Sequence, residues 1–113
     1  MQLQDATVDP QATVIPRDVL EVLAARVLAR VGDDPFFLGS ALVAYKRCAG
    51  VGIPGLAAFL GCPVAALPRL ALARRPGPHD PHVREQLDRI AARTGAKRDR
   101  LAAVLQFWHR EGG

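Results

Sequence analysis

The sequence predicts an all-α protein. Apolar residues recur at the helical spacing of three and four positions near both ends of the chain. β-Branched residues are scattered, and no run alternates with the period of two that marks a strand. Glycines and prolines divide the chain into segments of helical length. We therefore expect a compact bundle of helices.

Length and composition narrow the class of protein. The chain has 113 residues, half of them hydrophobic, which suits one domain with a single core. No apolar run approaches the roughly 18 to 20 residues that span a bilayer, and the N-terminus lacks the apolar stretch of a secretory signal. We expect a cytoplasmic protein without a membrane segment. The net charge of +4 is compatible with a polyanionic partner.

The N-terminal part is expected to hold an arm and one amphipathic helix. Residues 1–15 show no sustained period and are expected to form a flexible arm. A helix is predicted over residues 16–32, with Pro16 suited to its first turn and Gly32 placed to cap its end. Its apolar stripe comprises Leu20, Leu23, Ala24, Val27, Leu28 and Val31.

Five further helices are predicted within residues 36–110, a range that we expect to form one domain. They cover about residues 36–49, 53–60, 63–73, 81–94 and 97–110. Asp80 and Pro81 are typical of an N-cap and a first helical position. The expected stripe of the first of these five helices comprises Phe37, Ala41, Val43, Ala44 and Cys48. In the last helix we expect burial of Leu101, Val104, Leu105 and Trp108.

The segment from Leu56 to Leu70 has the spacing of a helix-turn-helix. The two helices of this motif meet at about 90 to 120 degrees, so a small residue is needed where they touch and a glycine in the tight turn. Ala57 and Gly61 stand at those two places. The four leucines of the segment then point to one core: Leu56, Leu60, Leu67 and Leu70.

These residues resemble the helix-turn-helix of the Cro/C1-repressor (XRE-like) family. Residues 42–50 look like the family's first helix, and residues 89–101 look like its last two helices. Arg74, Arg75 and Pro76 resemble the basic loop that follows the recognition helix. The resemblance covers about residues 36–106. It implies a five-helix repressor-like domain, here preceded by an extra amphipathic helix.

The resemblance implies a small DNA-binding protein, and by extension a transcriptional regulator. The family grips DNA with a glutamine where this chain has Ile53. It reads DNA with polar residues at positions that are here Pro63, Val64, Ala65, Pro68 and Arg69. Base edges are recognised by Arg, Lys, Asn and Gln, so Arg69 is the single plausible reader. The expected DNA contacts are therefore mainly cationic and directed at phosphates: Lys46, Arg47, Arg69, Arg74, Arg75, Lys97 and Arg98.

The apolar residues at the reading positions support an alternative function. If Ile53, Val64, Pro68 and Leu72 are exposed, they form a contiguous apolar face, and such faces usually mark contact surfaces. The chain would then be a degenerate helix-turn-helix that acts as a protein-interaction adaptor. The helix over residues 16–31 is expected either to pack on the domain or to form a homodimer interface.

Catalytic and metal-binding patterns are weak. Neither Cys48 nor Cys62 lies near a histidine in the sequence, and we expect both thiols to be reduced, in or near the core. His79 and His82 have the spacing of two zinc ligands, but the cysteines lack the close pairing of structural zinc sites. We expect no enzymatic activity, no cofactor and no metal.

Overall fold

The computed structural model describes residues 16–77 and 79–110. The arm predicted for residues 1–15 lies outside this range. Within it the chain is all-helical, and the one β-type pairing is an isolated bridge between Phe37 and Arg74. The elements are α1 (Arg17–Val31), α2 (Leu38–Ala49), α3 (Ile53–Leu60), a short 3-10 helix η2 (Val64–Ala66), α4 (Leu67–Ala71), α5 (Val83–Thr94) and α6 (Arg98–Arg110).

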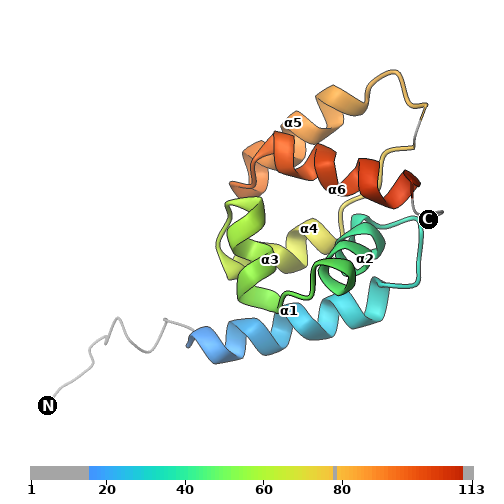
Figure 1. Cartoon of the computed structure of the whole chain (residues 1–113). Helices are drawn as coiled ribbons and strands as arrows, with labels where there is room; N and C mark the ends of the chain where they lie inside the picture. The colour runs from blue at the N-terminus through green and yellow to red at the C-terminus, as the bar shows by residue number, and fades with distance from the viewer. Residues whose placement is uncertain (1–15, 78, 111–113) are drawn as a thin grey trace, which may run out of the picture.

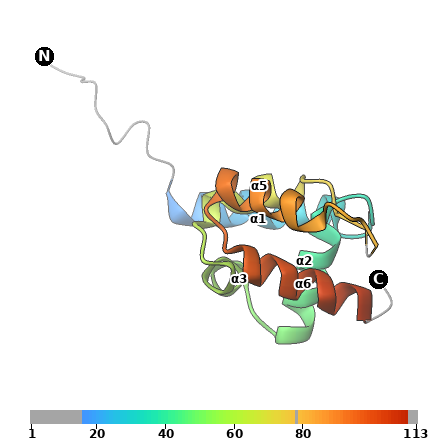
Figure 2. The same cartoon turned by 90° about the horizontal axis from the view of Figure 1, so that it is seen from above.

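The helices form two layers around one core. Seen from above, α1 and α5 lie on one side, and α2, α3 and α6 on the other (Figure 2). The short α4 lies between α1 below it and α5 above it and contacts both (Figure 1). The largest fully buried side chains come from α2, α3, α4 and α6: Leu38, Leu42, Leu56, Leu60, Leu67, Leu70, Leu101 and Val104.

The turn between α3 and α4 has the predicted geometry. The axes of α3 and the η2–α4 segment differ by 90°. Gly61 lies in the turn with φ of 76°, a conformation that glycine adopts without a steric cost, and its N–H donates to the carbonyl of Ala57 at 2.9 Å. Ala57 is buried at the helix contact. The angle of the turn, the place of Gly61 and the burial of the four leucines are as predicted.

The helix after the turn is shorter than predicted. The sequence predicts one helix over residues 63–73, whereas the structure has a 3-10 turn followed by only five α-helical residues. Pro68 explains the difference, because its ring would clash with the carbonyl of Val64 inside a continuous α-helix. With α4 beginning at Leu67, Pro68 falls in the first turn, where proline is tolerated.

The start of α5 also differs from the prediction. The helix begins at Val83, and not at Pro81 as predicted. Asp80 accepts a hydrogen bond from the His82 N–H at 2.8 Å and another from the Gln86 side-chain amide at 2.6 Å. The aspartate therefore organises the turn that leads into the helix and does not itself cap it.

Burial along α2 differs from its predicted stripe, because the N-terminal half of the helix is buried on all sides. Its buried residues run from Leu38 to Leu42, and Cys48 is exposed. Both thiols are free, as predicted, but only Cys62 is buried, and burial raises the pKa of its thiol. Gly39 lies where α2, α1 and α4 meet, and a Cβ there would collide with the side chain of Val31 and with Ala71.

Helix α1 packs on the other helices along one face. Ala24, Leu28 and Val31 are buried in the common core, and α1 contacts α2, α3, η2 and α4. Leu23, predicted to be buried, is 43% exposed, because the apolar residues of α1 occupy more than one face of the helix.

No single helix in the described ranges is both long and apolar enough to cross a membrane. The bent pair formed by α3 and the η2–α4 segment has the required length and composition, and its leucines are buried inside the molecule.

Candidate nucleic-acid interface

Helix α1 packs against α3 and η2, the elements that carry the expected reading positions. A shallow hollow between α1 and this segment is lined by Arg17 and Leu20 on one side and by Pro63, Val64 and Ala65 on the other. Farther along α1, Leu28 lies beside the N-terminus of α3, where Ile53 is only 9% exposed. Of the expected reading positions, Ile53 is therefore buried and Val64 is half-buried, whereas Pro63 and Ala65 remain exposed.

The exposed apolar face expected for the adaptor function does not form. Ile53 is buried, and Val64 and Pro68 are half-buried. Of the four residues, only Leu72 is well exposed, at 53%. The sequence-based expectation of a contiguous contact face is therefore wrong, because α1 packs against the elements that carry Ile53, Val64 and Pro68.

The C-terminal end of α4 remains open and forms a groove with α5. Two adjoining hollows of about 260 and 310 Å³ share Ala73, Ile90 and Arg93 in their walls. The first also includes Arg69, and the second Arg74 and Arg89. We call this feature the arginine groove, defined by Arg69, Arg74, Arg89 and Arg93.

The four guanidinium groups of the arginine groove are available to a ligand. All four residues are exposed, and none forms an ion pair with a described residue. The pKa of Asp80 is lowered first by its hydrogen bonds to the His82 N–H and to Gln86 and, to a smaller extent, by the charge of Arg74. Half-buried Ala73 and Ile90 give the groove an apolar floor.

An isolated backbone bridge fixes the arginine that follows α4. The Leu38 N–H donates to the Ala73 carbonyl at 2.7 Å, and the Arg75 N–H donates to the Phe36 carbonyl at 2.8 Å. Successive residues of such extended backbone point in opposite directions. Arg74 therefore points outward, with its guanidinium carbon 6.0 Å from the centre of the Phe36 ring.

Arg75 is directed into the molecule by the same bridge. Its Nε donates to the Pro35 carbonyl at 2.6 Å, and its guanidinium carbon lies 5.4 Å from the Trp108 ring centroid. Its Nη1 lies 3.3 Å from Nε2 of His109. The pKa of His109 is lowered mainly by burial and then by the charges of Arg75 and His79. These contacts indicate that Arg75 is a structural residue rather than part of the groove.

The other expected DNA contacts lie apart from the arginine groove. Lys46 and Arg47 line a hollow between α2 and α1. The aliphatic part of Lys97 lies against Gly61. Arg98 lies 3.4 Å from a carboxylate oxygen of Asp88 and 3.5 Å from one of Asp99, so its charge is already compensated within the fold.

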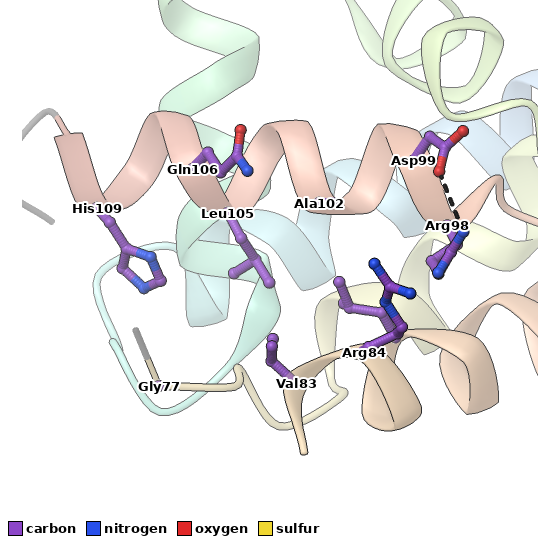
Figure 3. A pocket seen from close by; sticks show the side chains of 10 residues that line it. Gly77, Val83, Arg84, Arg98, Asp99, Ala102, Leu105, Gln106 and His109 are labelled. Atoms are coloured by element: carbon purple, nitrogen blue, oxygen red, sulfur yellow. Dashed lines mark ion pairs between the residues drawn. The ribbon is translucent and has the colours of Figure 1, made fainter. Parts of the chain in front are cut away.

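A second cavity lies between α5 and α6 (Figure 3). It has a volume of about 350 Å³ and an apolar floor that includes Leu87 and Leu105. Arg84, which is exposed, and Arg98, which pairs with Asp99, contribute its cationic wall. The ion pair leaves this cavity with fewer free positive charges than the arginine groove.

Sequence reasoning identified Arg69 and Arg74 but not Arg89 and Arg93. The two missed arginines lie four positions apart on α5, a spacing at which like charges repel. That unfavourable pair was a sequence signal for a candidate site on α5. The sequence does not show, however, that α5 packs beside α4. In the described ranges, no three His, Cys, Asp or Glu residues lie close enough together to hold a metal ion.

Comparison of the chain with protein-family models, with curated proteins and with solved structures finds no match.

Proposed function

We propose that this chain is a small DNA-binding helix-turn-helix protein that binds the phosphates of a duplex through the arginine groove. The observation that carries the proposal is the convergence of four exposed arginines, from α4, the extended segment after it and α5, without an acidic partner among the described residues. Arginine is well suited to phosphate, because its planar guanidinium donates two parallel hydrogen bonds.

The local geometry supports the assignment to the helix-turn-helix class. The 90° angle between α3 and the following segment falls within the range of the motif, and the turn glycine has the left-handed conformation that the tight turn requires. The resemblance to Cro/C1-type domains remains a proposal that rests on these features and on the order of the helices.

The mode of binding differs from that of a sequence-reading repressor. Because α1 covers the N-terminal end of η2, the contacts proposed here involve phosphates, which position a protein on DNA without specifying sequence. A regulator of this kind would act by occupying DNA. Its affinity would fall steeply with salt, because each phosphate contact releases a condensed counterion.

The test measures binding of a random-sequence duplex by fluorescence anisotropy at 50 and 200 mM salt. If four phosphates are neutralised, affinity should fall by roughly 150-fold between these concentrations. The variant Arg89→Glu/Arg93→Glu should retain at most two contacts, so its affinity should fall by only about 12-fold over the same range and should be lower at 50 mM.

The matched control is Arg17→Glu/Arg110→Glu, which changes the net charge equally at two exposed positions outside the groove. Long-range attraction is reduced to the same extent in both double variants, so a difference between them reports local contacts. Equal binding by the two variants, or no binding of the parent protein at 50 mM, would contradict the proposal.

A further inference from the structure

The outward face of α1 carries an apolar ridge that nothing in the described structure covers. Val19, Val22 and Leu23 are exposed at 44%, 50% and 43%. They are spaced by three and four positions, so they lie on one side of the helix, opposite Ala24, Leu28 and Val31. The ridge is therefore separate from the surface with which α1 covers the helix-turn-helix.

An acidic residue precedes this ridge along α1, and basic residues follow it. Asp18 precedes it at the N-terminal end of α1, and Arg26 and Arg30 follow it at the C-terminal end. All three residues are exposed, and none forms an ion pair with a described residue. At 100° per residue, Asp18, Val22 and Arg26 follow one another along the same strip of the helix surface.

We propose that a second copy of this chain docks on this ridge, with the two α1 helices antiparallel. An antiparallel arrangement with its two-fold axis near Val22 places Asp18 of each copy opposite Arg26 of the other copy. The apolar residues then meet in the centre. The surface is self-complementary, which is the requirement of an isologous dimer interface.

The order of the charges along α1 favours a second copy of the chain as the occupant and an antiparallel orientation of the two helices. A parallel pair would place Asp18 against Asp18 and Arg26 against Arg26, which is unfavourable on both sides. The α1 helix has 15 residues and is about 22 Å long, so the interface is small and the dimer weak. The inference goes beyond DNA binding and does not depend on it, since the ridge and the arginine groove share no residue.

The test reverses the charges at Asp18 and Arg26 in the full chain, singly and in a mixture. Dimerisation is measured by sedimentation equilibrium over a wide concentration range. Asp18→Arg alone and Arg26→Asp alone should each weaken dimerisation by roughly tenfold or more, because each change converts two symmetric attractions into repulsions. An equimolar mixture of the two variants should dimerise about as well as the parent chain. In that mixed pair both contacts again join opposite charges.

The control variants are Asp33→Arg and Arg110→Asp, which make the same charge changes at exposed positions off the ridge. Neither these variants nor their mixture should change the association constant by more than about twofold. Val22→Lys, which places a charge at the expected two-fold axis, should abolish dimerisation while leaving the helical circular dichroism spectrum unchanged.

Two results would overturn the inference. One is a parent chain that stays monomeric at the highest concentration measured. The other is a dimer that does not respond to charge as expected: either none of the ridge variants weakens it, or the equimolar mixture of the two charge variants fails to restore dimerisation. The first result would leave the ridge as a surface for another partner or for another part of the chain, and the second would place the dimer interface elsewhere.

Discussion

The two ends of the η2–α4 segment, which follows the tight turn at Gly61, differ in their surroundings. Its N-terminal end, around Val64, is covered by α1 and is apolar. Its C-terminal end, from Arg69 to Arg74, is open and cationic. The comparison shows that apolar and cationic residues of this segment have different surroundings: Val64 lies against the chain's own first helix, whereas the arginines face solvent.

The largest effect is expected where α1 docks. Leu28 is 3% exposed, so Leu28→Ala should reduce the free energy of unfolding by about 2–5 kcal/mol through lost burial and a residual cavity. Urea denaturation followed by circular dichroism measures this change. The matched control is Leu23→Ala on the outward ridge, which should cost less than about 0.5 kcal/mol at concentrations where the chain is monomeric.

This pair of variants also tests whether the first helix covers the motif in solution. If α1 were detached, both leucines would be exposed and the two substitutions would have the same small effect. Equal effects would therefore contradict the contrast between the covered and the open end.

A smaller effect is expected from the two arginines that follow α4. Arg75→Ala removes the hydrogen bond to the Pro35 carbonyl and the contact with the Trp108 ring, so it should destabilise the fold by about 1–3 kcal/mol. Arg74→Ala should change stability by less than about 0.5 kcal/mol but should weaken DNA binding. Thermal unfolding and anisotropy on the same samples separate the two roles. Reversed roles would show that the bridge between Phe37 and Arg74 does not orient these side chains as described.

The smallest effect is expected from the titration of His109. Its pKa is lowered in the folded chain, so the unfolded chain binds protons more readily as the pH falls through about 6.5. Stability contributed by neutral His109 is then present above that pH and is lost on acidification towards the folded pKa. His109→Gln should flatten the decrease in melting temperature between about pH 7.5 and 5.5. The same substitution at exposed His82 is the control, and an equal flattening there would contradict the assignment.

Local patterns in the sequence predict most of the helices. The apolar spacing and the glycines locate α1, α3 and α6 within one or two residues, and the leucines around Gly61 are buried as predicted. These features depend on neighbours in the chain. The buried residues of α1, Ala24, Leu28 and Val31, all belong to its predicted stripe, whereas Leu23 of the same stripe is exposed.

The candidate site could be predicted only in part, because it is formed by tertiary contacts. Arg69 and Arg74 follow from their position after the turn. Arg89 and Arg93 belong to the groove only because α5 packs beside α4. The opposite roles of Arg74 and Arg75 depend on a backbone pairing with residues about 40 positions away, which leaves no local pattern.

Gly39 has no side chain, and this absence determines how closely α2 can pack against α1 and α4. Glycine is the residue that lets α2 approach both Val31 of α1 and Ala71 of α4. A single added methyl group would act as a wedge beneath the end of α1 that is nearest to this contact. The seating of α1 against α2 and α4 therefore depends on an interior position at which any side chain would be too large.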